Sequence, residues 1–470
     1  MAEKLTSPLE IAAQYAQSYT QSLDSRPVAA IRSVSELREA LPATLPEKKE
    51  QAGRVIENLI STTEGGHISS TSGRFFAWVI GGTLPSALAA DWLVSMWDNN
   101  AALASCGPAA AVIEEIAGSW VKELLRLPSE ASFAFTTGCQ MAHVTCLAAA
   151  RHALLRQNGH DVEREGLYHA DPIRVITTEH HHGSVERALR FLGMGTACIE
   201  ALETDSTHRL SGDSVIRALQ RHHSPAILIL DAGDLNVGAM DHFDDIIPRA
   251  KASGAWVHID GAFGLWARTS NRYTELTKGL ELADSWATDA HKWLNTPMDC
   301  GIAIIRDTYS HRAAMTIDAS YLSAAKDTRD QIDWTPEWSR RARGIPVYAA
   351  IQELGREGIT EMVERCCDMA ALLVDRLAEL PGVKLVARPT INQGLVCFTA
   401  PSQNASEVEH DAYTDLIINA INAEGTAFFS GTSWKGHRAM RISVVNWRTD
   451  VDAINDTVKA VARVLERYNS

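Results

Sequence analysis

Short apolar runs alternate with amphipathic stretches through the middle of the chain. Each run is bounded by turn-forming residues, which is typical of a buried strand. Between the runs, apolar residues recur at helical spacing. This alternation predicts a mostly parallel, doubly wound α/β sheet, because parallel strands need crossover connections. The predicted strands are 131–135, 173–177, 197–202, 226–230, 255–259, 282–288 and 301–305, and the predicted helices are 109–125, 142–156, 185–192, 214–220 and 243–251.

The last third of the chain has a different pattern. Long helices are predicted over 340–355 and 360–380, and Pro381-Gly382 marks the end of the second. Strands and a closing helix follow, which is typical of a smaller α+β domain. The predicted strands are 383–387, 395–399, 427–430 and 440–445, and the closing helix is 451–468.

Helical stretches at the start of the chain are interrupted by Pro27, Pro42 and Pro46. Such a segment cannot bury a core alone, because proline shortens each helix. We therefore expect it to pack on the main body or on a second subunit. A loop rich in Gly, Ser and Thr is predicted over 61–73. The expected organisation is an N-terminal helical arm, a large domain and a smaller C-terminal α+β domain, at residues 1–70, 71–335 and 336–470.

Composition narrows the functional classes. The chain has 470 residues, of which 46% are hydrophobic, and a formal net charge of −14. This charge argues against a nucleic acid or an anionic membrane as partner. Residues 1–20 do not resemble a signal or transit peptide, and no apolar run approaches the ~20 residues that span a bilayer. A cytoplasmic location is expected. The cysteines show no metal-site or disulfide spacing, so we assign them no catalytic role.

Two adjacent strand ends carry candidate chemistry. Asp260 follows the strand 255–259, and Lys292 follows the run 282–288. Open α/β sheets bind ligands at the carboxyl ends of their strands. A lysine that forms an imine and an aspartate that pairs with a protonated ring nitrogen are the groups that pyridoxal phosphate (PLP) requires. Burial is expected to lower the pKa of Lys292 and leave a neutral amine. Taken alone, either residue also has an ordinary explanation, as a surface lysine or a turn-capping aspartate.

Two further motifs fit the same ligand. Residues 136–140 follow a strand and open a helix, whose N–H groups and dipole favour a phosphate. The signal is weak alone, because the segment lacks the P-loop and GxGxxG patterns. Residues 180–182 are consecutive histidines, whose side chains diverge, so we expect no metal site. His182 is the candidate for stacking on an aromatic cofactor, and His291 for contacting a phosphate, although a packed, hydrogen-bonded histidine is the alternative.

Together these motifs resemble the group II PLP-dependent amino-acid decarboxylases, which have the aspartate aminotransferase fold (fold type I). The resemblance covers most of the chain from about residue 74 onward. It rests on 74–76, 108–110 with 114–115, 182–188, 258–264 and 289–294.

The resemblance implies a role for each matching residue. Lys292 would carry the imine to PLP, and Asp260 would pair with the pyridine nitrogen. His182 would stack on the ring, with Ala262 on the opposite face. A homodimer with its active sites at the interface is also implied. The residues placed near the phosphate are Gly138, Cys139, Gln140, Asp289 and His291.

The chain departs from the family pattern at three points. Residues 139–142 replace the usual small residues and Glu-Ala of the phosphate turn. The segment 231–236 lacks the usual threonine near the cofactor hydroxyl, and Asn236 is the candidate replacement. The region 323–339 holds no tyrosine to protonate the intermediate, although Tyr321 precedes it. In the family, loss of that donor is linked to oxidative, aldehyde-forming chemistry.

We expect decarboxylation of an L-amino acid, with His182, Tyr321 or Lys292 returning a proton to Cα. The alternatives are an aminotransferase or an aldehyde-forming PLP enzyme and, more remotely, a non-catalytic PLP-binding protein. An aminotransferase needs a carboxylate clamp, for which Arg343 and Arg441 are candidates, although either would also fit a structural ion pair. The sequence does not identify the amino acid. The aromatic residues that indicate an apolar or aromatic substrate, and that would equally fit a core, are Phe75, Phe76 and Trp78.

Overall fold

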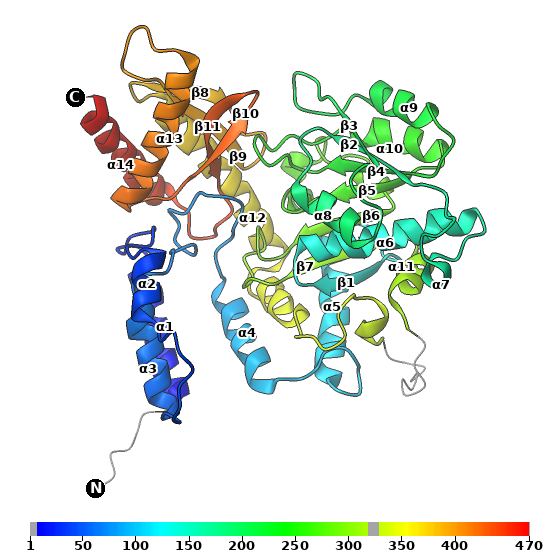
Figure 1. Ribbon diagram of the computed structural model, residues 1–470, viewed down its shortest axis with the longest axis horizontal. Coiled ribbons are helices and arrows are strands. Elements are labelled where there is room, and N and C mark those ends of the chain that lie inside the picture. Colours follow the sequence, from blue (N-terminus) through cyan, green and yellow to red (C-terminus); the bar gives the residue numbers. More distant parts are fainter. Residues whose placement is uncertain (1–6, 318–328, 470) are drawn as a thin grey trace.

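The computed structural model describes residues 7–317 and 329–469, and a seven-stranded sheet forms its larger part (Figure 1). The strands lie in the order β1-β7-β6-β5-β4-β2-β3. All neighbours are parallel except β7, which runs antiparallel to β1 and β6. The predicted mostly parallel α/β sheet is confirmed. The strands are β1 (Ser132–Thr136), β2 (Arg174–Thr178), β3 (Ile199–Leu202), β4 (Ala226–Asp231), β5 (Trp256–Asp260), β6 (Ser285–Asp289) and β7 (Gly301–Ile305).

Helices cover both faces of this sheet, which explains why its central strands are nearly continuous apolar runs. Successive residues of β4 serve opposite faces: Ile227 and Ile229 join one hydrophobic cluster, whereas Leu228 and Leu230 join the other. One face packs against α6 (Cys139–Gln157), α8 (Gly183–Phe191) and α11 (Thr308–Met315). The other face packs against α5 (Pro108–Leu124), α9 (Gly212–Gln220) and α10 (Phe243–Ala252).

The register of the parallel strands brings polar residues to one edge of the sheet. Asp231, the last residue of β4, lies opposite Asp260, the last residue of β5. Asp260 in turn lies opposite Ala287 of β6, two residues before Asp289. The turn that follows β6 carries Lys292. The fold therefore gathers the two strand ends that the sequence singles out.

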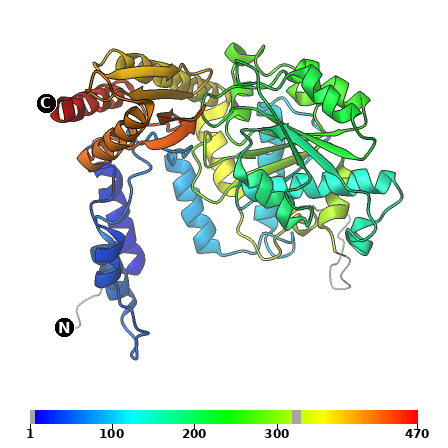
Figure 2. The ribbon, with the colours of Figure 1, turned by 45° about the horizontal axis from the view of Figure 1, so that its top comes forward.

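A smaller antiparallel sheet, of strand order β10-β11-β9-β8, lies beside the large one (Figure 2). Its strands are β8 (Val383–Ala387), β9 (Gln393–Phe398), β10 (Ser430–Trp434) and β11 (His437–Ser443), and its helices are α12 (Gly344–Ala378), α13 (Glu407–Glu424) and α14 (Val451–Asn469). Helix α12 packs on α5 as well as on β8 and β9, so it joins both sheets. The division into domains at residues 335 and 336 stays a prediction.

Some elements differ from the sequence predictions. The two helices expected over 340–380 form one element, α12, with a kink at Gly355, whose φ of 60° suits glycine. Helix α13 was missed, although the Ser406–Glu409 capping box marks its start. The strand expected at 427–430 begins only at Ser430.

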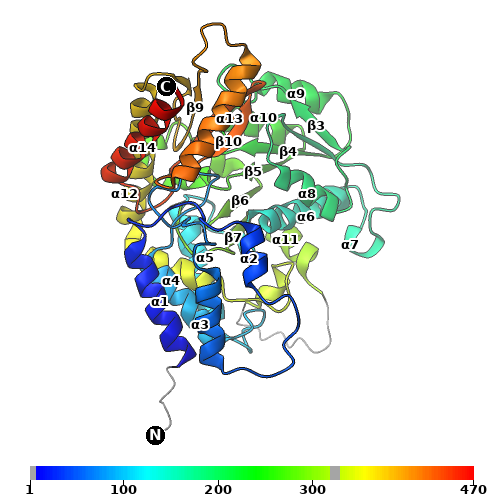
Figure 3. The same ribbon diagram turned by 60° about the vertical axis from the view of Figure 1, so that its left-hand side comes forward.

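The N-terminal segment extends away from both sheets (Figure 3). Its helices α1 (Pro8–Ser22), α2 (Val34–Ala40) and α3 (Ala52–Thr63) contain no buried residue among those described. Helix α4 (Pro85–Trp97) follows and packs against α12. In the part of the chain that the structure describes, no helix has both the length and the apolar character needed to cross a bilayer.

Candidate active site

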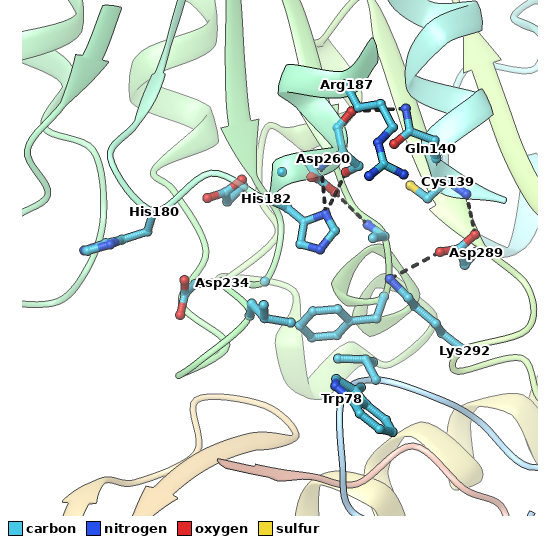
Figure 4. Close-up of a pocket in the computed structure, with 18 of the residues that line it drawn as sticks. Trp78, Cys139, Gln140, His180, His182, Arg187, Asp234, Asp260, Asp289 and Lys292 are labelled. Carbon is cyan, nitrogen blue, oxygen red and sulfur yellow. Dashed lines mark hydrogen bonds and ion pairs between the residues drawn. The ribbon is translucent and has the colours of Figure 1, made fainter. Parts of the chain in front are cut away.

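A cavity of about 510 Å³ opens at the carboxyl ends of β4, β5 and β6 (Figure 4). The last residues of these strands, Asp231, Asp260 and Asp289, all line it. Lys292 projects into the cavity from the turn after β6, and Arg441 reaches it from β11 of the smaller sheet. Both sheets therefore contribute charged side chains to one enclosed space.

Lys292 is held as a cation in this structure. Its side chain is 19% exposed, and its Nζ lies 3.2 Å from Oδ2 of Asp289. Burial alone would lower the pKa of Lys292, but Asp289, and after it Cys139 and Asp260, raise that pKa above its ordinary value. The expectation that burial leaves a neutral amine is therefore wrong, because Asp289, Cys139 and Asp260 together outweigh desolvation.

Asp260 stays ionised although it is buried. Burial would raise its pKa, but His143, and then His182 and Lys292, hold the pKa of Asp260 well below its usual range. The Nε2 atom of His143 lies 3.4 Å from Oδ2 of Asp260, and the Ala262 N–H donates to Oδ1 at 3.2 Å. The cavity thus presents a carboxylate that can accept from a protonated ring nitrogen.

The sequence pattern does not single out His143, because this residue lies inside a helix and belongs to no motif. Its spacing of four residues from Cys139 is the available signal, since side chains at that spacing share a helix face. The sulfur of Cys139 lies 3.5 Å from Nε2 of His143. Ligand atoms of Cys139, His143 and Asp260 also lie within 4.8 Å of one another, close enough for a metal ion. The hydrogen bonds among these residues account for the cluster without an ion.

The start of α6 brings together the residues expected near a phosphate. Gly138 precedes the helix, and the Cys139 N–H donates to Oδ1 of Asp289 at 2.6 Å. Gln140 donates through Nε2 to the Ser184 carbonyl at 3.3 Å. His291 places Nδ1 3.1 Å from the Cys300 carbonyl and 3.6 Å from Oδ1 of Asp289. Its position beside Asp289 keeps His291 close to this helix start.

Histidines 180–182 diverge, as their spacing suggested. His182 precedes α8 and lines the cavity, and the Ser184 N–H donates to its Nδ1 at 3.2 Å. Burial lowers the pKa of His182, and Asp260 offsets this only in part. His180 lines the outer part of the cavity, whereas His181 contacts Thr178 and Glu186.

Several expected residues lie elsewhere. Asn236 is outside the cavity lining, and its Oδ1 accepts from the Thr432 hydroxyl at 2.8 Å. Phe75 and Phe76 are core residues that stack on Phe428 and Phe429. They give no evidence for an aromatic substrate. Trp78 does line the cavity. Tyr321 lies outside the residues that the structure describes.

The two candidate arginines separate clearly. Arg343 lies outside the cavity lining and pairs with Asp299 at 3.2 Å. Arg441 lines the cavity, and its contact with the Ser430 hydroxyl is 3.4 Å long. Its buried Nε has no hydrogen-bond partner among the described residues. Burial lowers the pKa of Arg441 to about 10, and Asp234 only partly opposes this. Arg441 is thus a buried cation that still lacks a full set of acceptors.

A protein-family model matches most of the chain. The model described as the pyridoxal-dependent decarboxylase conserved domain matches residues 35–401. The chain belongs to this family. Enzymes of this family use PLP. One solved structure similar to this chain, that of Oryza sativa TDC, contains PLP and tryptamine.

The relatives cover nearly the whole chain. An aromatic-L-amino-acid decarboxylase of Bacillus atrophaeus is 25% identical over an alignment of 456 residues, and the alignment covers 95% of this chain and 92% of the relative. A 4-hydroxyphenylacetaldehyde synthase of Rhodiola rosea is 23% identical over 441 residues, or 91% and 88%. The Oryza sativa TDC structure has a TM-score of 0.91 at 22% identity and covers 100% of this chain and 99% of that one. The family thus includes both decarboxylases and aldehyde synthases.

The residues present fit PLP. The cofactor needs an amine for its aldehyde and a carboxylate for its ring nitrogen, and Lys292 and Asp260 supply them in one cavity. Ala262 adds only a methyl group to the lining, as a flat ring face requires. The start of α6 offers N–H donors suited to a phosphate.

Proposed function

We propose that this enzyme removes the α-carboxylate of an L-amino acid as carbon dioxide and releases the amine. The observation that carries the proposal is the enclosure of Lys292 and an ionised Asp260 in one cavity. When bound, PLP supplies the electron sink that accepts the electron pair of the broken carbon–carboxylate bond. The amino-acid decarboxylases among the relatives support this reaction class.

The residues around the cofactor have separate tasks. Lys292 would provide the amine that binds the cofactor aldehyde, and Asp260 would neutralise the protonated ring nitrogen. His182 would cover one face of the ring, with Ala262 on the other. Because the Ser184 N–H donates to Nδ1 of His182, the proton of the neutral imidazole is on Nε2, where it is available to the substrate.

Asp289 has a different task from the phosphate contact that the resemblance implied. A carboxylate only accepts hydrogen bonds and repels a phosphate. Its oxygens already contact the Cys139 N–H and Lys292. We assign Asp289 to positioning Lys292 and the first turn of α6. Because Asp289 already accepts from the Cys139 N–H, the proposed phosphate contacts that remain are Gly138, Gln140 and His291.

Arg441 supports a second candidate function. Arg441 is a cation that lines the cavity and, among the described residues, makes one long contact, with Ser430, so it suits an acidic group of the substrate. If that group is the α-carboxylate, a reaction that retains it, such as transamination, is favoured. The aldehyde synthases among the relatives support a third outcome, an aldehyde product. Arg343 is no longer a candidate, because it pairs with Asp299 outside the cavity lining.

We propose that two chains form the active assembly. Side chains on α4 are apolar and about half exposed, and a groove of about 740 Å³ separates α1 from α4. Exposed apolar surface of this extent is typical of an interface. A second copy would cover the arm, which has no core of its own. The exposed apolar residues of α4 are Trp92, Leu93, Met96 and Trp97.

A product assay with a panel of amino acids tests the reaction. Carbon dioxide and amine in equal amounts support decarboxylation, whereas a keto acid indicates transamination and an aldehyde indicates oxidative chemistry. Lys292→Ala should abolish both the visible imine absorbance of added PLP and turnover, because no other lysine lines the cavity among the described residues. Lys459→Ala, at a surface lysine, is the matched control and should retain both. Turnover by Lys292→Ala equal to that of the control would contradict the proposal.

A further inference from the structure

A chain of buried polar side chains leads away from the cavity behind Asp260. His143 of α6 approaches Asp260 with Nε2 at 3.4 Å and holds its Nδ1 2.9 Å from Nε2 of His258. On β5, His258 places Nδ1 2.9 Å from the hydroxyl of Ser285 on β6. The Trp256 indole N–H donates to the same hydroxyl at 2.9 Å. Both imidazoles and the serine are 0% exposed.

The direction of the first hydrogen bond follows from the carboxylate. Asp260 only accepts, so His143 donates to it through Nε2. The contact of 2.9 Å between Nδ1 of His143 and Nε2 of His258 is a second hydrogen bond, which fixes the plane of the His143 ring. Burial, reinforced by His143, lowers the pKa of His258 to about 3, which keeps that ring neutral. His143 is therefore held at both ring nitrogens, between Asp260 and His258.

We propose that His143 is a positioning residue that keeps the Asp260 carboxylate ionised and correctly oriented, and that His258 and Ser285 fix the orientation of the His143 ring. An ionised Asp260 is what keeps the ring nitrogen of PLP protonated, and a protonated ring withdraws electrons from the reacting carbon. This inference rests on the proposed function. It adds that residues outside the cavity lining influence the protonation of the PLP ring nitrogen through their contacts with Asp260.

The geometry favours this role over simple packing. If His143 only filled space, the Ala262 N–H would be the remaining hydrogen-bond donor to the Asp260 carboxylate among the described residues. Desolvation would then favour the neutral acid. Instead, the charge and hydrogen bond of His143 are the largest influences that oppose desolvation. Hydrogen bonds in a chain strengthen one another in a low-dielectric interior. Loss of the His143–Asp260 hydrogen bond should therefore change the protonation of the PLP ring nitrogen.

The test compares two substitutions at one position in the PLP-loaded enzyme. His143→Leu removes the donor, whereas His143→Gln retains an amide N–H that can reach Asp260. With PLP labelled with nitrogen-15 in its ring, the NMR shift of that nitrogen reports its protonation. We expect His143→Leu to move the shift toward that of a neutral pyridine and to lower kcat by roughly 10- to 100-fold, the effect of losing one hydrogen bond to a charged group. His143→Gln should restore most of both.

His311→Leu is the matched control. His311 is also 0% exposed and hydrogen-bonded, to Ser132 and the Trp334 carbonyl, but it lies outside the cavity lining. Its loss should leave the ring-nitrogen shift unchanged. An unchanged shift and kcat in folded, PLP-loaded His143→Leu would overturn the inference.

A second position keeps the inference testable if His143→Leu does not fold. Ser285→Ala deletes one oxygen and should move the nitrogen shift in the same direction by a smaller amount. An unchanged nitrogen shift in Ser285→Ala would overturn the role proposed for this hydrogen-bond chain. Failure of the proposed function has a different signature: the wild-type protein would form no imine at Lys292, and borohydride would leave no cofactor attached to that lysine.

Discussion

Replacing Arg441 with methionine should weaken amino-acid binding without disturbing the fold. Methionine keeps the length and apolar volume of the stem but removes the guanidinium. The pKa of Arg441 is lowered to about 10 by burial, which corresponds to roughly 3 kcal/mol of lost solvation. A substrate carboxylate that pairs with the guanidinium recovers part of this, because a hydrogen bond between charged groups is worth about 1.5–3 kcal/mol. We therefore expect kcat/KM to fall by about 10- to 100-fold.

Steady-state kinetics on the best substrate of the panel provide the assay, with KM and kcat determined separately. The matched control is Arg343→Met, which removes a similarly buried guanidinium that pairs with Asp299 outside the cavity lining. This control should stay within about twofold of wild type. The product amine, which lacks the α-carboxylate, should inhibit Arg441→Met and wild type equally if Arg441 binds that carboxylate. Unchanged KM and kcat in Arg441→Met would refute the reasoning.

Three further predictions concern charge, stability and product. Asp289→Asn removes the carboxylate that raises the pKa of Lys292. The rate at which the PLP-free enzyme forms the imine, followed by absorbance, should therefore begin to rise at lower pH than in wild type. Identical pH–rate profiles would contradict this. Glu114→Ala removes the ion-pair partner of Arg340, and the side chains of both residues are 0% exposed. Urea unfolding should show that the free energy of unfolding falls by about 3–5 kcal/mol, because an uncompensated charge stays buried. A fall below about 1 kcal/mol would count against a structural role for this pair. Tyr321→Phe should shift the product from amine toward aldehyde if Tyr321 returns the proton to Cα, and an unchanged product ratio would favour His182 or Lys292.

The sequence was sufficient to locate the centre of the site. Asp260 and Lys292 could be found because each follows a short apolar run, and parallel strands bring such ends to one edge of a sheet. The turn at 138–140 gave a weak signal by itself, and its contact with a phosphate stays a prediction. These predictions depend on local pattern and on a general property of parallel sheets, so they needed no knowledge of long-range contacts.

Residues that act through distant contacts were harder to predict. His143 meets Asp260 only because α6 packs across β5, and its place inside a helix gives no local signal. Arg441 was one of two arginine candidates, and only the packing of β11 beside the cavity separates it from Arg343. The predicted lowering of the Lys292 pKa was wrong, because a sequence does not show which way the Asp289 carboxylate points.

The reversed strand β7 has a consequence for the order of assembly during synthesis. In the sheet, β1 pairs with β7 alone, and β7 ends at Ile305, whereas β1 ends at Thr136. A ribosome must therefore add more than a hundred and fifty residues before the strand that carries the phosphate turn finds its neighbour. Truncated chains that end between Lys292 and Gly301 should fail to retain PLP, although they contain Lys292.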